Sequence, residues 1–178
     1  MGLYAPSPAI EDENPAGEAA RRRAGAYLLQ HAQREFTIPG ITLGARYSNS
    51  PAIINDDTPL PPDAPTVYVP CAKPGGRAPH VWMEDGSSLF DKLGFEWNLL
   101  DFTEDSSNAK VFQREAERLG IEMKVVKLHD HPVAIDLYER KLALIRPDQI
   151  VAWRGDEVSE ADVITTFDQI LTAATDAR

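Results

Sequence analysis

A proline-rich stretch between Asn55 and Pro70 constrains the fold of this chain more than any other feature of its sequence. Proline fixes φ and has no backbone N–H, so it interrupts helices and the interior of sheets. We therefore expect little regular structure in this stretch and a break between the residues on its two sides. The predicted division is an acidic tail and helix at residues 1–35, an extended proline-rich arm at 36–77, and a compact domain at 78–178.

The residues before the arm predict a short tail followed by one helix. Glu11–Glu13 is acidic and has little to bury, so the tail is expected to be extended or disordered. Asn14 and Pro15 suit the N-cap and the first helical position, and the helix is predicted over Glu18–Glu35. Its apolar face is expected to hold the residues at helical spacing, namely Ala20, Ala24, Tyr27, Leu28 and His31.

The arm itself is predicted to contain only two short strands, Ile41–Tyr47 and Val67–Val69. It nevertheless carries many large apolar side chains: Phe36, Ile38, Ile41, Leu43, Tyr47, Ile53, Ile54 and Leu60. A patch of this size is larger than soluble monomers usually expose. We therefore expect the arm to fold back on the compact domain or to be covered by a partner.

The compact domain shows alternating strand and helix patterns. A hairpin is predicted from His80–Met83 and Ser88–Phe90, with a type I′ turn at Asp85-Gly86. The remaining elements are strands over 95–102, 123–128, 142–145 and 150–153 and helices over 108–119, 132–138 and from 159 onward. A strand–helix–strand unit is parallel, and the Pro-Asp turn between the last two strands makes them antiparallel. The order β-α-β-α-β-β-α is that of the thioredoxin fold, so we expect a thioredoxin-like α/β domain.

Thioredoxin-like redox proteins keep a cysteine at the start of the helix that follows the first core strand, where the helix dipole lowers the thiol pKa. Thr103–Ser107 occupies that place here and contains no thiol. Glu139–Lys141 stands where the fold usually has a cis-proline. Cys71 is the only cysteine and lies in the arm. The sequence therefore predicts a redox-inactive domain.

Other common catalytic and cofactor motifs are missing as well. The glycines never form the GxGxxG pattern of a dinucleotide site, and there is no P-loop, GxSxG or HExxH motif. His129 and His131 are two residues apart at a strand end and should point to opposite sides, in an exposed loop. We therefore expect no catalytic residue, no bound cofactor and no metal in this chain.

The net charge of −10 argues against nucleic acid as a partner, because an acidic surface repels phosphates. No apolar stretch approaches the roughly 20 residues that span a bilayer, so no membrane partner is expected. The first residues lack the pattern of a signal peptide. The expected compartment is the cytoplasm.

Several short motifs resemble those of the FAD-dependent aromatic-ring hydroxylases, the relatives of phenol hydroxylase, 3-hydroxyphenylpropionate hydroxylase and the polyketide hydroxylases. The motifs are Leu43–Tyr47 with Ser50–Ile53, Pro74–Trp82 with Gly86–Asp91, and Leu144–Asp148 with Val151–Arg154. They follow the order of the family's linker and C-terminal domain, and the resemblance runs from about Glu18 to Leu171.

The resemblance implies a C-terminal domain without the flavin domain that precedes it in the family. FAD and NAD(P)H are then expected only in a complete parent enzyme, and this domain would serve stability and subunit or interdomain contact. The alternative is a subunit of a split phenol-type hydroxylase whose flavin domain is on another chain. The implied partner is a second copy, as a homodimer, or a flavin-binding domain.

Seven residues of the matching motifs are candidate interface or structural positions: Arg46, Tyr47, Arg77, His80, Trp82, Arg146 and Trp153. For three of them a structural role is the stronger expectation, with Trp82 packed and Arg77 or His80 bonded to loop carbonyls. Trp153 is expected to pack in or beside the core.

Overall fold

The computed structural model describes residues 5–175, which divide into two compact units. The first contains the residues up to Thr42 together with Ala64–Tyr68, and the second contains Leu43–Asp63 together with the chain from Val69 onward. Residues of the proline-rich arm thus contribute to both units.

The first unit is built around one long helix, α1 (Pro15–Phe36). Asn14 caps it by accepting hydrogen bonds from the N–H groups of Ala16 and Gly17, as expected. The preceding 3₁₀ turn, η1 (Pro8–Glu11), lies against the start of α1, and Arg21 donates to the carbonyls of Ile10 and Asp12. The tail before the helix is therefore folded against it, whereas an extended or disordered tail was expected.

The two strands predicted in the arm are absent, so this expectation was wrong. Pro39–Thr42 forms a short helix, α2, in which Gly40 lies so close to the carbonyl of Ala64 that a Cβ would be 1.8 Å from it. Beyond α2, Arg46 makes only an isolated bridge to Gly76. Val67–Val69 has no strand partner, because the N–H of Val67 closes a turn to Ala64 and prolines flank the segment.

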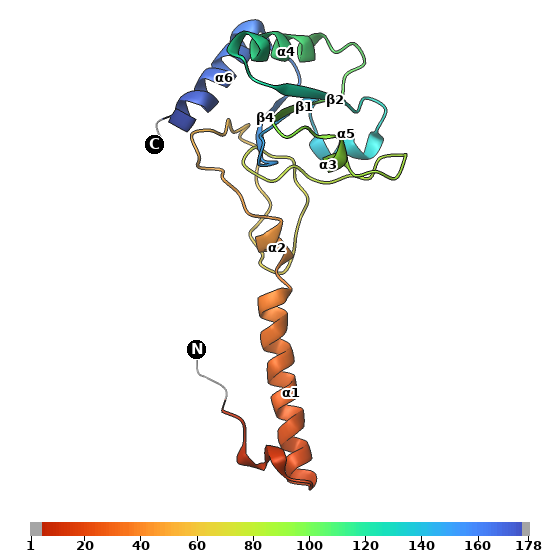
Figure 1. Cartoon of the computed structure of the whole chain (residues 1–178), viewed down its shortest axis with the longest axis vertical. Helices are drawn as coiled ribbons and strands as arrows, with labels where there is room; N and C mark the ends of the chain where they lie inside the picture. Colours follow the sequence, from red (N-terminus) through yellow and green to blue (C-terminus); the bar gives the residue numbers. More distant parts are fainter. Residues whose placement is uncertain (1–4, 176–178) are drawn as a thin grey trace. The chain divides into compact units, whose positions relative to one another are not determined.

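The second unit holds a four-stranded sheet (Figure 1). Its strands are β1 (Trp97–Asp101), β2 (Met123–Lys127), β3 (Leu142–Ile145) and β4 (Val151–Gly155), in the order β2-β1-β3-β4. β1 and β2 are parallel, and β3 is antiparallel to both β1 and β4. This is the thioredoxin-like arrangement that the element order predicted, and it is confirmed.

Helices cover both faces of this sheet (Figure 1). They are α3 (Leu89–Lys92), α4 (Ser107–Leu119), α5 (Pro132–Tyr138) and α6 (Glu160–Thr175). Leu99 of β1 packs on one face with Phe112 of α4 and Phe167 of α6. Leu100, the next residue, packs on the other face with Tyr138 of α5. Each face therefore has its own core, as the period-2 pattern of β1 predicts.

The helix ends follow the expected chemistry. Gly120 ends α4 with φ of +69°, and Ser159 and Asp162 exchange the reciprocal bonds of a capping box at the start of α6. Phe95, expected within the first strand, lies outside β1 and is exposed.

The predicted hairpin is only partly present. Trp82 and Ser88 form an isolated antiparallel bridge, but Ser88 then caps α3 with Asp91, so the expected Ser88–Phe90 strand is wrong. Gly86 has a positive φ while Asp85 does not, and a type I′ turn requires both. Asp85 instead accepts a hydrogen bond from the N–H of Ser87.

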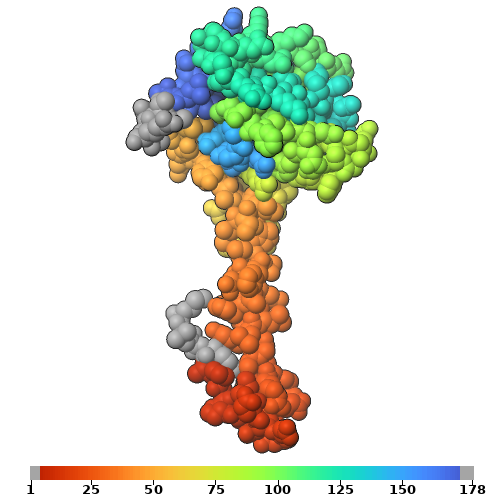
Figure 2. Space-filling model, viewed as in Figure 1, coloured from red at the N-terminus to blue at the C-terminus, as the bar shows by residue number. Residues whose placement is uncertain are grey.

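The outer edge of β4 is covered by residues that precede the sheet. The N–H groups of Gly75 and Ile54 donate to the carbonyls of Val151 and Ala152, and Arg77 bridges Ile150. Figure 2 shows the segment near residue 50, in orange, beside the blue residues of the last strand. Covering an edge strand blocks its pairing with other chains, so Leu43–Asp63 and the residues from Val69 to the sheet are part of this domain.

Candidate functional site

The junction between β1 and α4 is the place where thioredoxin-like enzymes carry their chemistry. Here it is occupied by Asp101, whose side chain is fully buried. The carboxylate accepts hydrogen bonds from the N–H of Thr103 at 2.9 Å and its hydroxyl at 2.6 Å. Ser106 Oγ donates to it at 2.5 Å, and Lys127 Nζ lies 3.2 Å away. The junction is thus a closed structural network.

Burial alone would raise the pKa of Asp101, but the hydrogen bonds from Ser106 and Thr103 and the ammonium of Lys127 outweigh it, so the pKa lies below its usual value. Ser106 adopts a left-handed conformation (φ +54°) at the N-cap of α4 and makes no side-chain cap bond, because its hydroxyl is turned toward Asp101. The same hydroxyl accepts a hydrogen bond from Lys127 Nζ, so the hydroxyl, the carboxylate and the ammonium at this junction are bonded to one another.

A cleft of about 800 Å³ opens beside this junction, between the first turns of α4 and α6. Its lining includes one ammonium, Lys141, and four carboxylates: Glu104, Asp105, Glu157 and Asp162. Lys141 is itself 3.7 Å from Glu157. The diphosphate of a dinucleotide needs free N–H groups and positive charge, so the residues of this cleft do not fit FAD.

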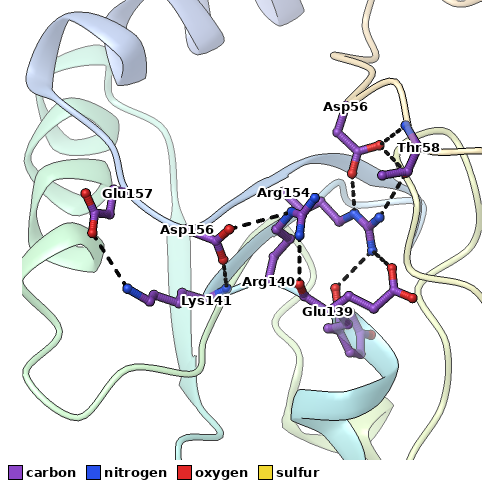
Figure 3. Close-up of polar contacts among 9 residues, drawn as sticks. Asp56, Thr58, Glu139, Arg140, Lys141, Arg154, Asp156 and Glu157 are labelled. Atoms are coloured by element: carbon purple, nitrogen blue, oxygen red, sulfur yellow. Dashed lines mark hydrogen bonds and ion pairs between the residues drawn. The ribbon is translucent and has the colours of Figure 1, made fainter.

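A second buried charge, Arg154 of β4, links distant parts of the domain (Figure 3). Its side chain is fully buried, and its Nε donates to Asp56 at 2.6 Å. Nη1 donates to the carboxylate of Glu139 and to the carbonyl of Tyr138, both at 3.0 Å. Nη2 donates to the hydroxyl of Thr58, also at 3.0 Å. All three guanidinium nitrogens are therefore bonded.

Local structure presents each partner to Arg154. Glu139 ends α5 in the left-handed conformation (φ +60°), which leaves the carbonyl of Tyr138 free of the helix and directed at the guanidinium. Asp56 also accepts from the N–H and hydroxyl of Thr58. Burial raises the pKa of Asp56, but the bonds from Thr58 and Arg154 outweigh it and hold the pKa below its usual value.

The rim of this cluster is weaker. Arg140 lies 3.8 Å from Asp156, which also accepts from the N–H of Lys141 at 3.1 Å (Figure 3). Long, partly exposed ion pairs of this kind contribute little to stability. The buried guanidinium is therefore the feature that fixes residues 56–58 onto the sheet.

The seven residues selected from the sequence do not form a single cluster. Arg46 bonds the carbonyl of Pro61 and the carboxylate of Asp63, and the N–H of Tyr47 donates to Gly75 while its ring is exposed. Arg146 pairs with Asp148 at 2.9 Å in the turn before β4. Trp153 is partly buried, with its ring 5.2 Å from Phe112, in agreement with the expected packing. Arg46 and Tyr47 pair through their backbones with Gly76 and Gly75, while the side chains of Arg146 and Trp153 have other partners.

Arg77, His80 and Trp82 do come together, around Phe90. Arg77 lies 4.9 Å over the Phe90 ring and donates to the side-chain oxygen of Gln149. His80 contacts Phe90 and, edge to face, Trp82 at 4.7 Å. Trp82 was expected to pack, and its ring contacts His80 while 68% of the residue is exposed. Its backbone bridges to Ser88, which leaves the side chain at the surface.

His131 also differs from expectation. It is buried and caps α5 by accepting from the N–H of Ala134 at 3.1 Å, while its other ring nitrogen lies 2.9 Å from the carbonyl of Trp82. His129 is exposed, as predicted. Across residues 5–175, no group of three or more His, Cys, Asp or Glu side chains is placed to hold a metal ion. None of the helices in that range is long and apolar enough to cross a membrane.

The sequence did not single out the two buried clusters. Arg154 was visible only as a charge in an otherwise apolar strand, and Asp101 as an acid at the end of another. A charge at a buried strand position signals a paired side chain. The pattern does not say which of the many acids in the chain is the partner.

Residues 72–174 match the model of a protein family described as aromatic-ring hydroxylase, C-terminal. Among curated proteins, the chain is 34% identical over 164 residues to the FAD-dependent monooxygenase apdD of Emericella nidulans, covering 87% of this chain and 26% of that protein. It is 28% identical over 177 residues to the phenol 2-monooxygenase of a Pseudomonas species, covering 90% and 29%.

The chain also resembles solved structures over most of its length. RebC, soaked with chromopyrrolic acid and holding 7-carboxy-K252c, matches with a TM-score of 0.76 and 33% identity. The match covers 94% of this chain and 31% of RebC. The chain therefore spans about 30% of the length of the relatives it matches.

Proposed function

Because the chain belongs to the family of aromatic-ring hydroxylase C-terminal domains, we propose that it is a non-catalytic domain of a FAD-dependent aromatic monooxygenase, serving stability and contact between subunits or domains. The observation that carries the proposal is the β1–α4 junction. The position that holds a reactive thiol in redox-active relatives of the fold is filled by the closed network of Asp101.

Cofactor chemistry would belong to the rest of such an enzyme. The relatives are FAD-dependent by name, and this chain spans about 30% of their length. The cleft between the first turns of α4 and α6 has four carboxylates and one ammonium in its lining, and this excess of negative charge opposes a diphosphate. FAD and NAD(P)H would therefore be bound by a complete enzyme and not by this chain.

A contact role is supported by large apolar and aromatic side chains left at the surface, including Trp82, Phe95 and Phe36. Tryptophan and other aromatics are enriched at the centres of protein interfaces. The partner would be a flavin-binding domain or a second copy of the chain. If the flavin domain is a separate polypeptide, the chain is one subunit of a split hydroxylase.

Two experiments test the proposal. The purified chain should bind no FAD and should not accelerate oxidation of NADH or NADPH when FAD and a phenol are present. Stoichiometric flavin retained through purification would contradict a non-catalytic role. The two forms of the proposal differ in co-purification, because only a split hydroxylase predicts a separate flavoprotein that stays with the tagged chain.

A further inference from the structure

Helix α1 is covered over only part of its surface. Gly17, Ala20 and Ala24 are buried near its start, and a Cβ on Gly17 would lie 2.0 Å from the carbonyl of Asp12. From Gly25 to the end no residue of the helix is buried. A helix in water draws most of its stability from packing an apolar face, so the uncovered part of α1 calls for a partner.

The uncovered part has a regular apolar face, which we call the α1 stripe: Gly25, Leu28, Leu29, Ala32 and Phe36. These residues recur at i, i+3, i+4, i+7 and i+11, the spacing of one helix face. Leu28, Leu29 and Phe36 are 59%, 62% and 78% exposed. A Cβ on Gly25 would meet no atom within 4 Å, so a neighbouring surface has room to approach the backbone there.

The α1 stripe is distinct from the face that the tail covers. Ala20 and Ala24 belong to a row that continues through Tyr27 and His31, whose rings stack at 6.0 Å. The stripe lies on a neighbouring side of the helix. One side of α1 is therefore covered within the unit, and another is apolar and open.

The comparison with RebC indicates what covers it. The match extends over 94% of this chain and so leaves about 11 of 178 residues unmatched, which is fewer than the 22 residues of α1. At least half of α1 thus has a counterpart in a chain about three times as long. The matched family is described as C-terminal, so the additional part of such proteins precedes the matched residues, on the α1 side of the chain.

Charge argues against a second copy on the same face. α1 contains Arg21, Arg22, Arg23 and Arg34 against Glu18 and Glu35, a formal charge of 4 − 2 = +2, in a chain whose net charge is −10. A symmetric dimer would place this basic helix beside itself, whereas a different partner can offer an acidic rim. We infer that the α1 stripe is the docking face for the flavin-bearing part of an aromatic hydroxylase, an inference that rests on the proposed function.

In the test, the full chain replaces the third of RebC that it matches. The product is a chimera of this chain and the remaining part of RebC. The rate of trypsin cleavage measures whether α1 is covered, because trypsin cuts after the arginines of α1. We expect α1 to be cut rapidly in the chain alone and at least about tenfold more slowly in the chimera, because cleavage then requires the docked helix to open.

Two stripe variants and one matched control make the test specific. Leu28→Glu with Leu29→Glu, and separately Gly25→Leu, should restore rapid cleavage in the chimera. Gly25→Leu also favours helix formation in the chain alone, so faster cleavage in the chimera would not reflect a weaker helix. Gln30→Glu adds negative charge on the side of the helix opposite the stripe and should leave the protection intact.

Each other outcome overturns the inference. Stripe variants as protected as the parent chimera, or a chimera cut as rapidly as the chain alone, would show that the flavin-bearing part does not cover α1. Protection in the chain alone would assign the stripe to a second copy if light scattering shows a dimer, and to the chain itself if it shows a monomer. Flavin bound by the chain alone would instead contradict the proposed function.

Discussion

The two buried charges of the sheet domain are satisfied in different ways. Asp101 is bonded by residues close to it in sequence, Thr103 and Ser106, and by Lys127 of the neighbouring strand. Arg154 is bonded by Glu139 and, across 98 positions of the chain, by Asp56. The first network fills the place of a catalytic group, and the second attaches a preceding segment to the sheet. Both use buried charge to maintain the structure of the domain.

The largest difference in stability between a variant and the parent chain is expected at Arg154. Arg154→Met keeps the aliphatic stem but leaves the carboxylates of Asp56 and Glu139 without their buried partner, so unfolding should become easier by about 3–5 kcal/mol. Urea unfolding followed by tryptophan fluorescence measures this. Arg140→Met, at a partly exposed arginine 3.8 Å from its acid, is the control and should cost less than about 1 kcal/mol. Equal losses of stability in the two variants would show that Arg154 contributes no more to stability than Arg140.

Asp101 should matter less, because its network is local. Asp101→Asn removes the ion pair with Lys127 and weakens bonds that depend on a charged acceptor, at an expected cost of about 2 kcal/mol. The exposed Asp130→Asn is the control and should be within about 0.5 kcal/mol of the parent. If Asp101→Asn lost more stability than Arg154→Met, the predicted order of the two clusters would be wrong.

Both clusters predict the same response to acid. The folded-state pKa values of Asp56 and Asp101 lie below their usual values, so each carboxylate contributes stability that is fully present above about pH 4. That contribution is lost as the pH falls through the folded-state pKa. The double variant Asp56→Asn, Asp101→Asn should therefore lose less stability than the parent between about pH 5 and pH 3. Identical pH profiles would contradict the assigned shifts.

The smallest effect is expected at Cys71. A single cysteine cannot cycle through an intramolecular disulfide, and the β1–α4 junction holds no thiol. The chain should not reduce insulin disulfides, and Cys71→Ser should behave like the parent. Insulin reduction that disappears in Cys71→Ser would show that the domain retains redox chemistry.

Short-range patterns were sufficient to predict much of the sheet domain. The period-2 alternation in β1, the stripe of Ala109, Phe112 and Ala116 in α4, and the capping box of α6 depend on residues within a few positions of each other. Each element they predict is present. The order of these elements then predicted the thioredoxin-like topology, because parallel and antiparallel connections have different lengths.

The errors fall where long-range contacts decide the conformation. Ile41 looked like a strand residue, but α2 forms where Gly40 packs against Ala64, more than twenty residues later. His131 looked like a residue of an exposed loop, but it caps α5 and contacts the carbonyl of Trp82, 49 positions earlier. The bonds of Arg154 depend on partners that no local pattern identifies. The candidate site was therefore less predictable than the fold.

The central claim is that the domain is a structural unit that includes the segment attached by Arg154. The most direct test compares the unfolding of residues 43–178 with that of residues 72–178, which start where the family match begins. The longer piece should unfold cooperatively at the same urea concentration as the full chain. The shorter piece loses Asp56, Thr58 and the buried Ile53 and should be less stable by at least about 3 kcal/mol. Equal stability of the two pieces would contradict the account.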